Sequence, residues 1–182
     1  MILYIFMTVF IAGLMVGRTP EYLGKKIGKP EVLASIIGVL FPSFVIMILT
    51  SIAVINPFSL TKLNNLGPHG FSEILYAYSS GVGNNGSAFA GLTTDNVFFN
   101  TTIGIAMIIG RYIVIIPVMF IAGSMSIKKT LVESAGTFKT DSFVFLILLL
   151  SIILIVGALN HFPSLILGPI LEHLYMINGI VF

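Results

Sequence analysis

Residues 79–91 form a run of glycines and small polar residues, and these residue types are suited to a chemical role. The run reads Ser-Ser-Gly-Val-Gly-Asn-Asn-Gly-Ser-Ala-Phe-Ala-Gly and lies between hydrophobic stretches long enough to cross a bilayer. Unpaired backbone N–H and C=O groups are costly in hydrocarbon, so irregular backbone at that depth must be buried in protein or line water. Carbonyls of such a loop can replace the hydration shell of an ion. The run therefore predicts an ion-conducting filter.

The residues just before this run predict a short helix from His69 to Ser80. Pro68 breaks the preceding chain, Ser72 is placed to cap the helix, and Glu73 would lie in its first turn. Roughly ten residues rise about 15 Å, which is half of a bilayer core. The negative end of the helix dipole would face a cation at the glycines. The pattern predicts a re-entrant pore helix followed by a filter loop.

Two other interpretations of the glycine run were weighed. Residues 81–86 match the G-x-G-x-x-G dinucleotide fingerprint, but no strand precedes them and Asp95 follows too soon for the ribose contact. The local composition also fits a plain external turn rich in Gly and Asn. The flanking apolar stretches count against that interpretation.

Composition places the chain in a membrane. Of its 182 residues, 57% are hydrophobic and 9% charged, whereas soluble domains carry about 25% charged residues. A formal charge of +2 gives no indication of nucleic-acid binding, and the absence of cysteine excludes disulfides and thiolate metal sites. The fold class predicted is an all-α integral membrane protein.

Apolar runs predict about four transmembrane helices, with the pore helix between the second and third: Met1–Val16, Val32–Ile55, Val97–Gly123 and Phe143–Leu159. The tail Ser164–Phe182 contains Pro169 and is expected to be interfacial. Most basic residues fall in the two loops on one side, which the positive-inside rule makes cytoplasmic, and both termini are then external. They are Arg18, Lys25, Lys26, Lys29, Lys128, Lys129 and Lys139.

A helix, pore loop, helix unit cannot enclose a pore alone. Four units are needed around the axis, from four repeats in one chain or four copies of a short chain. Arg111 stands near the middle of the third span, where a charge is costly, so it should face the protein interior. It is expected near the inner side of the pore, where it would limit leak. The alternative is a packing role, in which it bonds helix-end carbonyls near Gly110 or Pro117.

Several motifs in order make the sequence specifically similar to one family, the potassium-binding A subunit of the Kdp potassium-transporting ATPase. The main motifs are GRTPEYLGKK at 17–26, GPHGFSE at 67–73 and NNGSAFAGL at 84–92. Shorter matches are Gly110-Arg111, IIPVM at 115–119, IAGS at 121–124, GAL at 157–159 and LGP at 167–169.

The resemblance implies a potassium-channel-like fold of four repeats, of which this chain matches the C-terminal third. Residues 1–31 would end the third repeat and include a cytoplasmic loop, 32–123 would form the fourth repeat, and 124–182 would hold a loop, the final span and an external tail. The other three filter loops are then missing, so the chain is expected to be a fragment, a split subunit or a nonfunctional remnant.

The resemblance also implies the function: K⁺ is bound by filter carbonyls and passed towards a P-type ATPase subunit in a bacterial inner-membrane complex with accessory subunits. The filter strand would be Asn84, Asn85, Gly86 and Ser87, although the amides of the two asparagines could instead brace the loop. No aspartyl-phosphorylation motif or Walker loop is found, so no catalytic or ATP site is expected here. A separate chain would supply the missing repeats.

The remaining polar residues are assigned less specific roles. Glu73 is favoured as a first-turn residue over an ion ligand, and His69 is expected to shape the outer mouth. His161, Glu172 and His173 match no common metal spacing and are expected on a solvated outer surface. Residues 18–31 form a cytoplasmic turn that could contact the ATPase subunit. The alternative function is a passive homotetrameric K⁺ channel.

Overall fold

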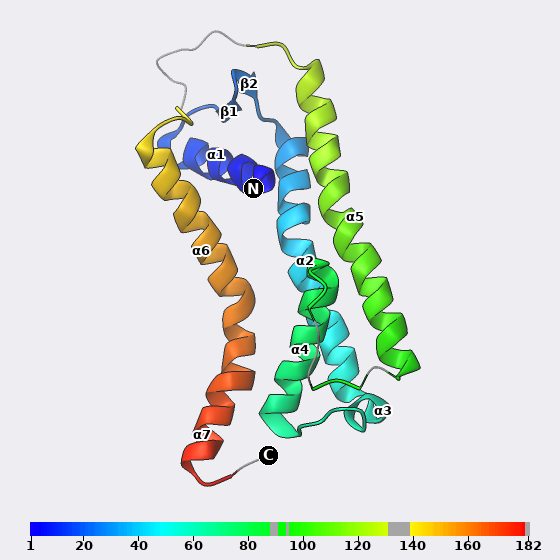
Figure 1. Cartoon of the computed structure of the whole chain (residues 1–182). Helices are drawn as coiled ribbons and strands as arrows, with labels where there is room; N and C mark the ends of the chain where they lie inside the picture. Colours follow the sequence, from blue (N-terminus) through cyan, green and yellow to red (C-terminus); the bar gives the residue numbers. More distant parts are fainter. Residues whose placement is uncertain (88–90, 94, 131–138, 181–182) are drawn as a thin grey trace. The chain divides into compact units, whose positions relative to one another are not determined.

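The computed structural model describes residues 1–87, 91–93, 95–130 and 139–180, and it is mainly helical (Figure 1). This confirms the all-α membrane class. A two-stranded antiparallel hairpin and a π-helical turn, Ile166–Ile170, are the other regular elements of the described chain. The helices are α1 (Ile2–Val16), α2 (Lys29–Ile55), α3 (Pro57–Leu60), α4 (Gly67–Gly83), α5 (Val97–Ile127), α6 (Phe143–Leu165) and α7 (Leu171–Ile177).

Three helical stretches of the described residues are long and apolar enough to cross a membrane: Lys29–Ile55, Val97–Ile127 and Phe143–Ile177. They confirm three of the four predicted spans. The remaining one is α1, which is apolar but has only 15 residues. Its length is about 22 Å at 1.5 Å per residue, shorter than a hydrocarbon core of about 30 Å.

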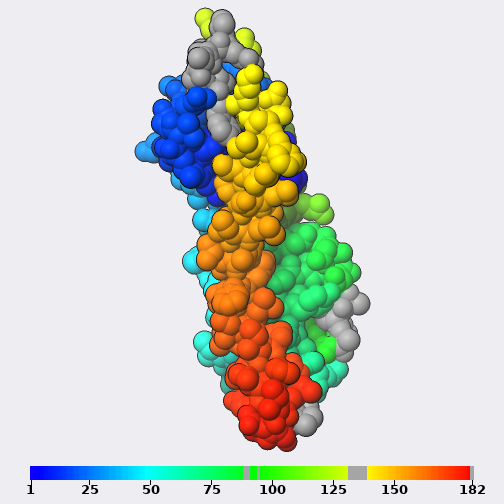
Figure 2. Space-filling view, turned by 90° about the vertical axis from the view of Figure 1, so that its left-hand side faces the viewer, coloured from blue at the N-terminus to red at the C-terminus, as the bar shows by residue number. Residues whose placement is uncertain are grey.

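The tail does not break where the sequence suggested. The sequence predicts that the last span ends at Leu159 and that Ser164–Phe182 is a separate interfacial segment, whereas the helical backbone continues to Ile177. Pro169 lies inside the π-helical turn between α6 and α7. Proline has no N–H to donate, so the regular α-helical hydrogen-bond pattern is interrupted at this position. The wider π-helical turn accommodates the interruption, and the helix continues beyond it. Figure 2 shows this helix from yellow to red, and only 11% of its most apolar stretch is buried within the chain.

The chain forms two compact units. Unit 1 consists of Met1–Phe41 and Ile113–Ala158, and unit 2 consists of Pro42–Tyr112 and Leu159–Phe182. Each unit has its own buried apolar cluster. The division into residues 1–31, 32–123 and 124–182, which the resemblance implied, stays a prediction.

Unit 1 is built around α1. Phe6 and Val9 of α1 are buried in a cluster that includes Ile121 of α5 and Phe145 of α6. The loop after α1 was expected to be a simple turn, but it contains a hairpin of β1 (Glu21–Tyr22) and β2 (Lys25–Lys26). Leu23 and Gly24 both have positive φ, at 52° and 69°. Two such residues in a two-residue loop match the twist of antiparallel strands, which explains the hairpin.

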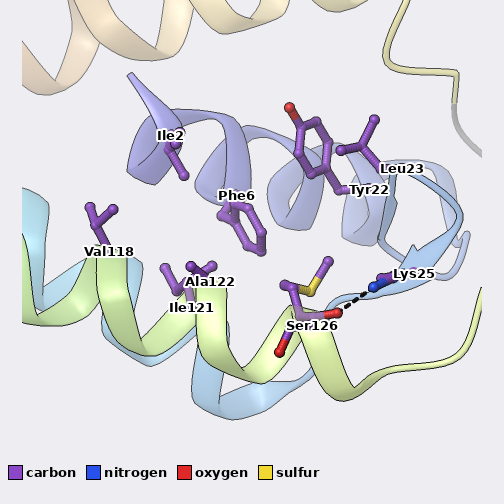
Figure 3. Close-up of a pocket in the computed structure, with 10 residues that line it drawn as sticks. Ile2, Phe6, Tyr22, Leu23, Lys25, Val118, Ile121, Ala122 and Ser126 are labelled. Carbon is purple, nitrogen blue, oxygen red and sulfur yellow. Dashed lines mark hydrogen bonds between the residues drawn. The ribbon is translucent and has the colours of Figure 1, made fainter.

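The hairpin is fastened to the end of α5. The Lys25 Nζ donates to the carbonyl oxygen of Met125 at 2.6 Å, beside an apolar pocket of about 370 Å³ (Figure 3). The Lys128 Nζ donates to the carbonyl oxygen of Lys26 at 2.9 Å. The two basic loops therefore touch within unit 1, which supports their placement on one side of the membrane. Which side that is stays a prediction.

Candidate functional site

The helix before the glycine run is α4, and it is longer than predicted. It begins at Gly67 and ends at Gly83, with Pro68 in its first turn, where the fixed φ of proline is compatible with a helix. Because it starts earlier than His69, two predictions were wrong. Ser72 does not cap the helix and instead donates its hydroxyl to the carbonyl oxygen of Pro68 at 3.1 Å. Glu73 lies beyond the first turn.

The apolar face of α4 packs within unit 2. Ile74, Ala77 and Tyr78 of α4 are buried together with Phe99 and Ala106 of α5. The Tyr78 hydroxyl shares a hydrogen bond with the hydroxyl of Thr102 at 2.8 Å. These contacts fix the rotation of α4 and so decide where its C-terminal end delivers the following loop.

The helix ends in a left-handed turn. Asn84 has φ 52°, and its N–H bonds to the carbonyl oxygens of Gly81 and Ser80. Asparagine tolerates this conformation better than most side chains. Gly86 follows with φ 70° and open space where a Cβ would lie, so its conformation rather than crowding requires glycine.

The asparagine side chains brace this loop. The Nδ2 of Asn84 donates to the carbonyl oxygens of Met107 at 3.0 Å and Val82 at 3.2 Å. The Oδ1 of Asn85 accepts from the hydroxyl of Ser80, and from the N–H and hydroxyl of Ser87 at 3.1 and 2.9 Å. The Asn84 Nδ2 and the Asn85 Oδ1 are thus bonded to protein groups.

The backbone carbonyls of the loop are not committed in this way. Within the part of the chain that the structure describes, no hydrogen bond is donated to the carbonyl oxygens of residues 84–87. Backbone carbonyls that accept no hydrogen bond from the described residues can serve as cation ligands. Ala88–Ala90 and Thr94, which belong to the same motif region, lie outside the described residues.

The return limb of the loop, Gly91–Thr93, is held by residues 62–65. The N–H of Asn64 donates to the carbonyl oxygen of Gly91 at 2.9 Å, and the N–H of Thr93 donates to that of Lys62 at 3.1 Å. Leu63 and Leu92 form an antiparallel bridge between these hydrogen bonds. The loop is therefore fixed at both ends, by α4 and by its return limb.

Arg111 follows a close helix contact. A Cβ at Gly110 of α5 would overlap the backbone of Val82, which lies two residues before Asn84. Arg111 is exposed within the chain, and its side chain makes no hydrogen bond or ion pair with the described residues. The prediction that Arg111 lies near the inner side of the pore and faces the protein interior stays a prediction.

Sequence reasoning missed a small polar cluster. Glu172, expected on a solvated surface with His161 and His173, has its Oε1 2.7 Å from the Nδ1 of His69. The other ring nitrogen of His69 lies 3.7 Å from Glu73 Oε1. These residues come from α4 and α7, so no spacing in the sequence could have brought them together.

Comparison with known proteins gives a consistent result across the chain. The family model described as the potassium-transporting ATPase A subunit matches residues 1–174. A potassium-binding subunit of a potassium-transporting ATPase from Leptospira interrogans is 56% identical over 183 residues, covering 100% of this chain and 33% of the relative. The corresponding subunit from Mesorhizobium japonicum is 53% identical over 181 residues, covering 100% of this chain and 32% of the relative.

A third relative, the potassium-transporting ATPase potassium-binding subunit from Bradyrhizobium diazoefficiens, is 49% identical over 182 residues. The chain spans about a third of the length of the curated relatives that it matches. A family model covering more than half of the chain, over both compact units, leaves one conclusion: the chain belongs to the potassium-transporting ATPase A subunit family.

Proposed function

We propose that this chain is part of the K⁺-binding and K⁺-translocating membrane subunit of an ATP-driven potassium uptake complex. The observation that carries the proposal is the loop after α4, where four carbonyls accept no hydrogen bond among the described residues. The side chains of Asn84 and Asn85 are used to brace the loop. Backbone carbonyls of residues 84–87 therefore act as the K⁺ ligands, and the side chains set their positions.

Gly86 gives a direct test of the filter. With φ 70°, an L side chain there is strained even though space is open. We expect Gly86→Asp to weaken apparent K⁺ affinity of the complex by more than tenfold, because it adds strain and a carboxylate beside the ligands. The measurement is K⁺-dependent ATP hydrolysis of the purified complex. Gly104→Ala, where a Cβ meets nothing within 4 Å, is the control; an unchanged affinity in Gly86→Asp contradicts the assignment.

We propose that Arg111 faces the ion pathway on the inner side of the filter. It is exposed within this chain and adjacent to the contact between Gly110 and Val82. A charge facing lipid costs about 2.5–3.5 kcal/mol on insertion scales, so protein or water should cover it. A fixed positive charge at that place repels K⁺ and limits passive leak. Arg111→Gln is expected to change K⁺ affinity or passive K⁺ flux in proteoliposomes, and a packing role predicts lower stability with both unchanged.

The chain corresponds, in this proposal, to the C-terminal third of the family's length and carries the fourth filter loop. The resemblance of residues 84–92 to the fourth of the family's loops supports this position. A second chain supplies the other three repeats. The test is complementation of potassium uptake with truncated relatives. Rescue by a relative lacking its last third supports the position, and rescue only by one lacking its first third would place this chain at the other end.

The partners follow from the same reading: a P-type ATPase subunit that hydrolyses ATP, and accessory subunits, in a bacterial inner membrane with both termini of this chain external. To test these partners, native membranes are solubilised gently, the complex is isolated through a tag on this chain, and its components are identified by native mass measurement. Recovery of an ATPase subunit and a second repeat chain supports a split pump. A four-copy assembly lacking ATPase indicates the passive channel, and recovery of neither indicates a nonfunctional remnant.

A further inference from the structure

Glu73 is an unusual residue in unit 2. Its side chain is only 10% exposed, and its Oε1 accepts a hydrogen bond from the Nδ2 of Asn65 at 2.5 Å. Its Oε2 is buried and has no hydrogen-bond partner among the described residues. A buried carboxylate oxygen without a partner costs free energy. Stability alone therefore does not explain why a carboxylate occupies this place.

The carboxylate is packed against the return limb. A Cβ added at Gly91 would overlap the end of the Glu73 side chain. The carboxylate cannot swing away without leaving Asn65, and the neighbouring Asn64 holds the carbonyl oxygen of Gly91 at 2.9 Å. Glu73, residues 64–65 and Gly91 therefore form one packed contact between the pore helix and the far end of the loop.

Glu73 has a second polar neighbour, His69, in the same helix. His69 lies between two carboxylates, with Nε2 3.7 Å from Glu73 Oε1 and Nδ1 2.7 Å from Glu172 Oε1. His69 therefore links Glu73 on its own helix to Glu172 of α7. The contacts with Asn65 and Gly91 give Glu73 a role through shape and hydrogen bonding, which Glu73→Gln would keep.

We infer that Glu73 is a positioning residue of the ion filter, which holds the return limb at Gly91 and thereby fixes the loop that carries residues 84–87. The inference rests on the proposed function of that loop. The loop is fixed at Asn84 by the end of α4 and at Gly91 by Glu73 and Asn64. Releasing one end lets the carbonyls spread, and ion selectivity depends on their placement.

The test compares Glu73→Ala and Glu73→Gln in the intact complex, by ATP-driven uptake of K⁺ and of Rb⁺. Glu73→Ala is expected to raise the KM for K⁺ about tenfold and to reduce K⁺/Rb⁺ discrimination, with kcat changed less than about twofold. Glu73→Gln keeps the shape and the acceptor for Asn65, so its KM should stay within about threefold of the unchanged complex. A merely structural role lowers yield or kcat without changing discrimination between the ions.

Glu172→Gln is the matched control, because Glu172 also pairs with His69 but lies on α7. It should leave the KM unchanged. Gly91→Ala displaces the carboxylate without removing it and should reproduce Glu73→Ala, and it also serves if Glu73→Ala fails to assemble. In Glu73→Ala/Gly91→Ala the second change should add little, since no carboxylate remains to be displaced.

Three results would overturn the inference: an unchanged KM in Glu73→Ala, or in Gly91→Ala where Glu73→Ala fails to assemble; an equal rise in Glu73→Gln; or an equal rise in Glu172→Gln. The last two would assign the effect to charge at the mouth. Absence of K⁺ uptake by the unchanged complex is a separate result, which contradicts the proposed function itself.

Discussion

Two buried carboxylates, Glu31 in unit 1 and Glu73 in unit 2, are satisfied to different degrees. The side chain of Glu31 is fully buried, and its carboxylate accepts from the Gly28 N–H at 2.7 Å, from the Ser124 hydroxyl and from Lys128 at 2.8 Å. Glu73 has one short hydrogen bond, from Asn65, and one oxygen with no partner in the described chain. The first arrangement is closed and joins helix ends, whereas the second remains open beside the loop.

The comparison shows which of the two carboxylates keeps an oxygen that can still accept a hydrogen bond. A buried ion pair whose atoms are all satisfied has no capacity for a further ligand, so the Glu31 contact serves to join α2 to the end of α5. A carboxylate with an unpaired buried oxygen lowers the stability of the fold. Because Glu73 lies beside Gly91, we relate its presence to the structure of the loop. Substitutions that remove a hydrogen-bond donor from Glu31 or from Glu73 test this difference.

Lys128→Met should have the largest effect on stability, because it leaves Glu31 buried without its ion-pair partner. We expect a loss of about 3 kcal/mol, at the lower end of the range for broken buried pairs since Lys128 is 29% exposed. The measurement is reversible SDS unfolding followed by circular dichroism. Lys129→Met, which changes an exposed neighbour, is the control; equal losses in the two variants would show that the pair does not carry the junction.

Asn65→Ala should have an intermediate effect by removing the hydrogen-bond donor of Glu73. A loss of about 1–2 kcal/mol is expected for leaving a buried acceptor unpaired. Unlike the Lys128 change, it should also raise the KM for K⁺ uptake. Lys62→Met in the same loop is the control, because its 3.5 Å pair with Asp95 is exposed and should contribute less than about 0.5 kcal/mol. A stability loss without any change in KM would separate Glu73 from the filter.

Ser124→Ala should have the smallest effect. It removes one donor to Glu31 while Lys128 and Gly28 remain, so about 1 kcal/mol is expected, with K⁺ affinity unchanged. Ser126→Ala is its control, since Ser126 is exposed and its hydroxyl donates to the carbonyl oxygen of Gly123 in its own helix. If Ser124→Ala cost as much as Lys128→Met, the closed arrangement would depend on every donor at once.

The sequence predicted the elements better than their ends. Apolar length identified three long helices and α1, because hydrocarbon requires continuous hydrophobic helix. The sequence prediction starts α4 too late, because it treats Pro68 as a break although proline is favoured in the first turn of a helix. It ended the last helix too early at Leu159, because the π-helical turn that accommodates Pro169 leaves no pattern in the residues.

For the site, residue types predicted a filter within residues 79–91, because irregular backbone between apolar spans must be buried in protein or line water. The family resemblance placed the filter strand at residues 84–87 with Gly86, and that assignment stays a prediction. The family followed from motifs that occur in order along the chain, and the family match confirmed it. The roles of side chains did not follow. Spacing could not tell whether the amides of Asn84 and Asn85 face an ion or the protein.

Only tertiary structure decided which partners those side chains have. Met107 reaches Asn84 from α5, Glu172 reaches His69 from α7, and Gly91 closes on Glu73 from the return limb. Each contact joins residues far apart in the chain, and its existence depends on how helices pack rather than on local preference. Hydrophobic length determined that the chain enters a membrane; packing between distant segments decided which polar groups brace the loop and which remain open.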